Sequence, residues 1–250
     1  MGDERQAALD AIGDEVRTCT RCRLHEGRTK AVPGEGDPDT EVVFVGEGPG
    51  FNEDREGRPF VGRAGGMLVR LLGSVGWQRE DVFITNVVKC RPPDNRDPQP
   101  DEIAACAPYL RRQLEVLDPA VVVTLGRYSM GTFMPGARIG QAHGTSQPVD
   151  PETGAANALV FAMYHPAAAL RSPGVERDSF EDMRHVPEAL VRARELREGG
   201  ASPAPDGATM TAAPAPAPAP TLDPPADPAS STVIGAAEPA AEDVSQLTLF

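Results

Sequence analysis

Glu41–Gly46 reads EVVFVG, a short run of apolar and β-branched residues from which the architecture of the chain can be inferred. Three further runs of this kind follow it: Asp81–Val88 (DVFITNVV), Ala120–Leu125 (AVVVTL) and Ala158–Tyr164 (ALVFAMY). Runs that are apolar almost throughout, rather than at alternate positions, are typical of strands covered on both faces. The sequence therefore predicts four buried strands.

Helical patterns lie between and after these runs, at Gly65–Gly73, Pro100–Leu117 and near Phe180–Arg197. The first repeats apolar residues at helical spacing, and the second opens with a proline and two acids, which suit a first helical turn. Strands that alternate with helices form parallel sheets joined by right-handed crossovers. We therefore predict an α/β fold for residues 1–199, with a parallel sheet between two layers of helices.

The composition of the chain changes at Gly199-Gly200. The 250 residues carry a net charge of −13, and residues 1–200 hold 24 Lys and Arg against 31 Asp and Glu, a net charge of −7. This balance argues against a protein that coats DNA by bulk electrostatics, but it allows a local basic face. Ten of the 26 prolines lie between residues 201 and 241, so we expect residues 200–241 to form a disordered linker.

The chain has neither an N-terminal apolar segment of the signal-peptide type nor an apolar run of 18 residues. We therefore expect a soluble, cytoplasmic protein with no membrane association. Its cysteines are Cys19 and Cys22 in a Cys-x-x-Cys pair, Cys90 and Cys106. In a cytosolic enzyme, four cysteines more often bind metal than form disulfides. Four thiols suit zinc or an iron–sulfur cluster, and unrelated buried thiols are the alternative.

Polar or glycine-rich residues follow the predicted strands. They are Glu47-Gly-Pro-Gly50, Asn86, Gly126 and His165-Pro166. In open α/β sheets, ligands bind at the carboxyl ends of the strands, so we expect these residues to form one site. Glycines let the backbone approach a ligand closely, although a tight turn would need them too.

Three side chains near this site suit a nucleobase, and each also has a purely structural explanation. Asn86 offers a donor and an acceptor side by side, but a buried Asn can instead satisfy backbone groups. Phe60 lies in a loop with several arginines, which favours base stacking near phosphates, whereas a Phe is by default a core residue. His165, taken alone, is more often structural than catalytic.

Together these residues resemble the family-4 uracil-DNA glycosylases. The resemblance rests on Gly46–Gly66 (GEGPGFNEDREGRPFVGRAGG), Thr85-Asn86, His165-Pro-Ala-Ala and the four cysteines. It implies a three-layer sandwich with a four-stranded parallel central sheet. It also implies a DNA-repair enzyme that hydrolyses the N-glycosidic bond of uracil, with a structural 4Fe–4S cluster held by Cys19, Cys22, Cys90 and Cys106.

The resemblance also assigns substrate-binding roles. Uracil would be flipped out of the DNA stack into a pocket bounded by Gly46 and Gly48. Phe60 would stack on the ring, and Asn86 would read its O4 and N3 edge. The family motif usually has Ala where this chain has Gly48. Glu47, at the pocket floor, is then the candidate for excluding the methyl group of thymine.

The implied chemistry is dissociative and monofunctional. His165 would donate a hydrogen bond to O2 of the leaving base, and water would capture the sugar cation. Either Glu47 or Glu53 would position that water or stabilise the cation. Leu170 would fill the vacated stack from the minor groove, and Arg171 would contact phosphate. The segment 91–105 lacks the His with which a related group traps DNA covalently, so no such trapping is expected.

The last residues of the chain resemble a second known motif. Gln246-Leu-Thr-Leu-Phe250 is similar to the pentapeptide by which bacterial repair proteins bind the sliding clamp. We therefore expect residues 242–250 to bind the clamp, with contacts from Gln246, Leu247, Leu249 and Phe250, although short matches also arise by chance. The implied protein is a bacterial, nucleoid-associated monomer.

Two other functions compete with uracil excision. One is a glycosylase of the same fold that acts on other deaminated bases, which Gly48 leaves open. The other is a non-catalytic, metal-stabilised nucleic-acid-binding module. The sequence does not decide between single- and double-stranded substrates.

Overall fold

The computed structural model of the chain describes residues 2–199. The predicted linker, residues 200–241, and the predicted clamp-binding segment, residues 242–250, lie outside the described residues. None of the helices in residues 2–199 is long and apolar enough to cross a membrane.

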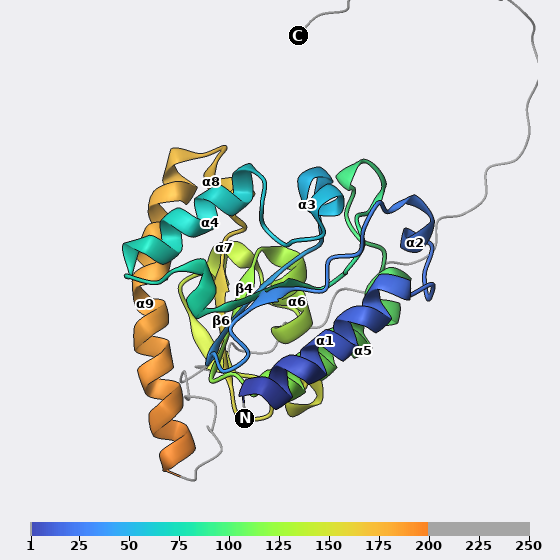
Figure 1. The fold of residues 1–250 in the computed structure, drawn as a ribbon. Helices are drawn as coiled ribbons and strands as arrows, with labels where there is room; N and C mark the ends of the chain where they lie inside the picture. The colour runs from blue at the N-terminus through green and yellow to red at the C-terminus, as the bar shows by residue number, and fades with distance from the viewer. Residues whose placement is uncertain (1, 200–250) are drawn as a thin grey trace, which may run out of the picture. The chain divides into compact units, whose positions relative to one another are not determined.

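A mixed sheet with the strand order β1-β3-β2-β4-β6-β5 lies at the centre of the described part (Figure 1). The four predicted runs form its parallel strands, which confirms that prediction: β2 (Val42–Gly46), β3 (Phe83–Asn86), β4 (Val121–Leu125) and β6 (Leu159–Met163). The sheet has six strands rather than four, because β1 (Glu35–Gly36) and β5 (Ser146–Pro148) pair antiparallel with its edges.

Helices cover both faces of the sheet, so the predicted three layers are present (Figure 1). The apolar side chains of β2 divide between them: Val43 and Val45 pack toward α1 and α5, whereas Val42 and Phe44 pack toward α4 and α9. The first layer contains α1 (Gly2–Thr18), α5 (Pro100–Leu117) and α6 (Arg127–Phe133), and the second contains α4 (Arg63–Ser74), α8 (Pro166–Ala169) and α9 (Pro173–Glu198). Burial on both faces explains the continuous apolar runs.

Capping residues determine where the main helices begin. The bounds of α5 match the prediction, and a capping box joins Gln99 to Glu102, whose carboxylate accepts the Gln99 N–H at 2.7 Å. Helix α9 begins earlier than predicted, because the Ser172 side chain caps it and Pro173 occupies its first position. Helix α1 was not predicted. The remaining short helices are α2 (Leu24–Gly27), α3 (Phe51–Glu56), α7 (Ile139–Ala142), η1 (Arg79–Asp81), η2 (Pro93–Asn95) and η3 (Pro151–Thr153).

Candidate active site at the carboxyl ends of the strands

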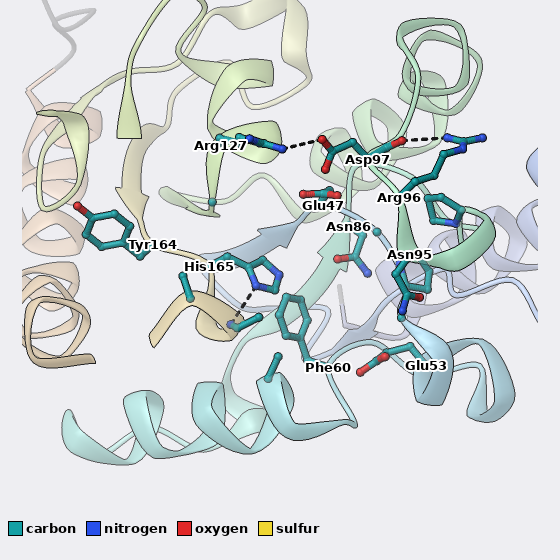
Figure 2. A pocket seen from close by; sticks show the side chains of 18 of the residues that line it. Glu47, Glu53, Phe60, Asn86, Asn95, Arg96, Asp97, Arg127, Tyr164 and His165 are labelled. Atoms are coloured by element: carbon teal, nitrogen blue, oxygen red, sulfur yellow. Dashed lines mark hydrogen bonds and ion pairs between the residues drawn. The ribbon is translucent and has the colours of Figure 1, made fainter. Parts of the chain in front are cut away.

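A cavity of about 680 Å³ opens where the parallel strands end (Figure 2). This volume is in the range of sites that bind small molecules. The glycine-rich turn after β2, the end of β3 and the residues after β6 all contribute to its wall. Of the residues predicted for the site, the cavity is lined by Glu47, Gly48, Glu53, Phe60, Asn86, His165 and Arg171.

Two residues predicted for the site lie beside the cavity rather than in its wall. Gly46 lies behind the ring of Phe60, where a Cβ atom would come within 2.6 Å of that ring and 2.4 Å of Asn86 Oδ1. Only glycine therefore lets the two side chains meet across β2. Leu170 lies just beyond α8 and is 38% exposed, so its side chain is available on the surface.

Phe60 forms one wall of the cavity. Its ring is buried and lies 5.7 Å from the His165 ring, at an interplanar angle of 30° (Figure 2). Its backbone adopts a φ of 51°, a left-handed conformation that costs a non-glycine residue about 1–3 kcal/mol. Gly65 makes room for this conformation, since a Cβ atom there would lie 1.8 Å from the Phe60 carbonyl oxygen.

Two charged side chains hold the Phe60 loop in place. The Glu53 carboxylate accepts hydrogen bonds from the backbone N–H groups of Val61 at 3.0 Å and Gly62 at 2.9 Å. Arg79 donates to the Phe60 carbonyl oxygen at 2.8 Å. Neither contact was predicted from the sequence, because both depend on loops that fold onto each other. Glu53 therefore uses its carboxylate to hold the loop that positions Phe60.

Asn86 ends β3 and is only 1% exposed. Its side-chain oxygen Oδ1 is buried and accepts no hydrogen bond from residues 2–199. A buried polar atom left unpaired costs about 1–3 kcal/mol, so native structures rarely leave one without a reason. The arrangement suits a ligand that brings its own donor to Asn86.

Behind Asn86 lies a buried lysine that the sequence interpretation did not single out. The Lys89 ammonium donates to Thr85 Oγ1 at 2.5 Å, to the Asn86 carbonyl oxygen at 2.9 Å and to Gln113 Oε1 at 2.6 Å. Burial lowers the pKa of Lys89 to about 7. Its three hydrogen bonds join the end of β3 to α5 and hold the backbone from which the Asn86 side chain projects.

His165 precedes α8 and caps it. Its Nδ1 atom accepts the backbone N–H of Ala167 at 3.1 Å (Figure 2). Because a backbone N–H can only donate, the proton of the neutral ring must lie on Nε2. Burial, and secondarily the charge of Arg171, lower the pKa of His165 to about 4. At neutral pH the ring is therefore an uncharged donor in the cavity wall.

Glu47 differs from Glu53 in its surroundings. Its side chain lines the cavity, and its carboxylate forms no hydrogen bond or ion pair with any residue of the described range 2–199. Burial raises the pKa of Glu47, as does the charge of Asp97, whereas Arg127 opposes the rise. Of the two candidate carboxylates, Glu47 is the one available to a ligand or water.

Gly48 lines the cavity, and its closest neighbours show what a side chain at this position would contact. A Cβ atom at Gly48 would lie 2.7 Å from Val88 Cγ2 and 3.8 Å from Pro92 Cδ. It would have neither Phe60 nor Asn86 among its nearest neighbours. A methyl group at this position would therefore press on Val88 rather than directly on Phe60 or Asn86.

The four cysteines line a second, smaller cavity between α1, the loop after β3 and α5. All four are free thiols, and three of them accept hydrogen bonds: the Arg28 guanidinium donates to Cys90 Sγ at 3.2 Å, and the backbone N–H groups of Lys89 and Arg21 donate to Cys106 Sγ at 3.3 Å and Cys19 Sγ at 3.5 Å. Burial raises the pKa of Cys106 to about 11, so thiolates here need a cation. No three potential ligands within residues 2–199 are already arranged around a metal position. The donor set fits a four-thiolate metal group.

Known proteins with a similar sequence indicate the family to which the chain belongs. Residues 33–190 match the family model of the uracil DNA glycosylase superfamily. The type-4 uracil-DNA glycosylase of Saccharolobus solfataricus is 50% identical over 188 residues, which cover 73% of this chain and 86% of that protein. Those of Thermotoga maritima and Archaeoglobus fulgidus are 46% and 44% identical, over 67% and 72% of this chain and 86% and 92% of theirs. The chain therefore belongs to the uracil-DNA glycosylase superfamily and, within it, to the type-4 uracil-DNA glycosylases.

Proposed function

We propose that this chain excises uracil from DNA by hydrolysing the N-glycosidic bond, which leaves an abasic site and begins base excision repair. The observation that carries the proposal is the unpaired Oδ1 atom of Asn86, which lies in one cavity with the Phe60 ring and the neutral His165. The base must leave the DNA stack to enter this cavity, because its glycosidic bond is inaccessible within a duplex.

Asn86 accounts for the choice of base. Uracil presents an N3–H donor beside the O4 acceptor, and the Asn86 side chain offers the matching oxygen and amide. Cytosine presents an acceptor at N3 beside an amine donor, so both hydrogen bonds would be lost. A buried polar group left unpaired by the wrong base gives strong rejection. Phe60 stacks on either ring and supplies affinity rather than this discrimination.

His165 stabilises the leaving group. As the bond between C1′ and N1 breaks, its electron pair passes to the base and negative charge develops at O2. The Nε2–H of His165 donates to that oxygen, and the bond strengthens as the charge grows. Preorganised donors of this kind contribute about 3–4 kcal/mol in other enzymes. The uracil anion later takes a proton from solvent.

Glu47 is our choice for the carboxylate that acts on the sugar side. Departure of the base leaves an oxocarbenium ion at C1′, which a water molecule captures while it loses a proton. Glu47 lines the cavity without a partner in the described residues, so it is free to orient that water and accept the proton. Glu53 already binds the backbone of the Phe60 loop. The Glu47→Gln variant should lose turnover while it still binds DNA.

The thiol cavity would hold a 4Fe–4S cluster on Cys19, Cys22, Cys90 and Cys106. When bound, the cluster would cross-link α1, the loop after β3 and α5, and it would take no part in bond cleavage. Iron analysis and absorption near 400 nm test this assignment on the purified full chain. About four iron atoms per chain would support it, and a colourless, zinc-loaded protein would refute it.

Two further assignments concern the contact with DNA and with a partner. Leu170 would replace the everted base in the stack, and Arg171 would bind a phosphate.

The segment Gln246–Phe250 would tether the enzyme, as a monomer, to the sliding clamp at the nucleoid. Deletion of these five residues should abolish co-elution with the clamp and leave uracil excision from free oligonucleotides unchanged. Equal clamp binding by the truncated chain would exclude the tether.

The enzymatic proposal is tested with oligonucleotides that differ only in one base. The full chain is incubated with each oligonucleotide, and alkali then cleaves any abasic site. A nick at uracil alone is the expected result. Nicks at hypoxanthine or xanthine instead would indicate a different deaminated base, and no nick with any of them would leave a non-catalytic binding module.

A further inference from the structure

Several arginines without an ion-pair partner in residues 2–199 line the cavity or are close in sequence to residues that line it. Elsewhere in the described residues, most arginines form ion pairs with carboxylates, as Arg112 does with Glu15. Arg55, Arg63, Arg91 and Arg171 form no ion pair within residues 2–199, and each lies in the cavity wall or within two residues of it. In a chain of strongly acidic composition, these guanidinium groups are available to an anionic partner.

Phe51 connects two of these arginines. It is the first residue of α3, directly after Gly50 in the cavity wall, and it is 52% exposed. The guanidinium carbon of Arg55 lies 5.6 Å from the centre of its ring, and that of Arg91 lies 5.2 Å away. The ring thus orients one arginine from α3 and one from the loop after Cys90.

An aromatic ring and a carboxylate hold an arginine in different ways. A carboxylate neutralises the guanidinium, whereas a ring orients it and leaves most of its charge available to a second partner. Arg91 is also fixed by its hydrogen bond to Asn95 Oδ1 at 2.7 Å, and Asn95 lines the cavity. Both guanidiniums are therefore oriented on the Phe51 ring without an ion-pair partner in residues 2–199.

We propose that Phe51, Arg55 and Arg91 form a phosphate platform that binds the backbone of the uracil-containing strand next to the everted nucleotide. The proposal rests on the proposed function and goes beyond it, because it names the surface along which the strand runs. Phosphodiester groups fit the two planar cations, which can each offer two parallel donors. The platform contacts no base, so its binding is independent of sequence. Arg91 directly follows Cys90, so the platform and the thiol site share the loop after β3.

The test measures binding of the full chain to a single-stranded oligonucleotide by fluorescence anisotropy at several salt concentrations. The oligonucleotide carries 2′-fluoro-2′-deoxyuridine, whose glycosidic bond resists cleavage. Each lost phosphate contact should make the plot of log affinity against log salt shallower by about 0.7. We therefore expect a change of about 0.7 for Arg55→Gln or Arg91→Gln and about twice that for the double variant. On the same oligonucleotide with ordinary deoxyuridine, whose glycosidic bond can be cleaved, the single-turnover excision rate at saturating enzyme should stay at the wild-type value.

Phe51 is tested with two substitutions that keep the fold. Phe51→Ala and Phe51→Leu both remove the ring, and the second retains apolar bulk. Both should weaken binding severalfold, because the arginines lose their orientation while they keep their charge. Matched controls lie on α9: Arg184→Gln removes an exposed, ion-paired arginine, and Val191→Ala removes an apolar side chain that is 53% exposed. Both controls should bind as the wild type does.

Three results would overturn the platform. They are an unchanged salt dependence in the double arginine variant, wild-type affinity in both Phe51 variants, or a loss of single-turnover rate with unchanged affinity. The failure of the proposed function is recognised separately. A wild-type chain that leaves uracil intact would refute the enzyme, whereas the salt dependence of binding would still decide the platform.

Discussion

At the scale of single residues, we propose that the unpaired Oδ1 atom of Asn86 recognises the substrate. An Asn86→Ala chain loses the complement to the N3 and O4 edge of uracil, while the fold keeps its backbone contact to Lys89. We expect kcat/KM for uracil-containing DNA to fall by about 10- to 100-fold, which corresponds to a hydrogen-bonding loss of about 1–3 kcal/mol. Single-turnover excision measures this loss, and the melting temperature is the control. Wild-type excision by this variant would remove Asn86 from the site.

His165 gives a prediction for pH dependence. Its pKa lies at about 4, below its ordinary value of 6.5, so the folded chain holds the neutral ring in a range where the unfolded chain takes up a proton. The stability from this group is fully present above pH 6.5 and is lost as the pH falls through about 4. The His165→Ala chain should lack this acid-side loss, which denaturant unfolding at a series of pH values measures.

The same pKa shapes the activity profile. Because the ring stays neutral down to about pH 4, the excision rate should show no His165 inflection near 6.5. An inflection near 6.5 that disappears in His165→Gln would contradict the neutral-donor assignment.

At the scale of elements, the start of α4 determines where the Phe60 ring lies. Gly65→Ala would place a Cβ atom 1.8 Å from the Phe60 carbonyl oxygen, so the loop must move and the ring with it. Gly66→Ala, the neighbouring change on the same helix, meets no atom within 4 Å. We expect Gly65→Ala to lower both the melting temperature and kcat/KM, and Gly66→Ala to be neutral or stabilising by about 0.5–1 kcal/mol. Equal behaviour of the two variants would rule out this role for Gly65.

The turn after β3 depends on Lys89. Lys89→Met keeps the length of the side chain but leaves three buried acceptors without their donor. We expect the free energy of unfolding to fall by at least about 1–3 kcal/mol, as urea denaturation would show. The loss of excision should be smaller in an Asn86→Ala background, because Lys89 acts on catalysis by positioning Asn86. A full additive loss in the double variant would indicate a general structural role instead.

At the scale of the whole molecule, part of the fold could be predicted because its signals are local. The parallel strands carry continuous apolar runs, and α5 carries its own capping residues. Strands β1 and β5 read Glu-Gly and Ser-Gln-Pro, which have no apolar signal, and they take strand form by pairing with β3 and β6. Helix α1 is largely polar and contacts the core through a narrow stripe that includes Leu9, Ile12 and Val16, so its pattern is weak.

The candidate site, like the fold, could be predicted from the sequence only in part. The positions of Asn86 and His165 follow from a rule about strand ends, which needs only the order of the elements. The contacts that position Phe60 and Asn86 do not follow from this rule, because they join distant parts of the chain: Arg79 donates to the Phe60 carbonyl oxygen across 19 residues, and Lys89 donates to Gln113 across 24. The different surroundings of Glu47 and Glu53 likewise depend on which loops fold together. Such tertiary contacts leave no periodic pattern in a sequence.

The central claim is that one cavity at the strand ends encloses an everted uracil between Phe60, Asn86 and His165. A crystal structure of the full chain with uracil bound tests it most directly. We predict that the base stacks on the Phe60 ring, with its N3–H donating to Asn86 Oδ1 and its O2 accepting from His165 Nε2. A uracil bound elsewhere, or bound in this cavity without a contact to Asn86, would contradict the account.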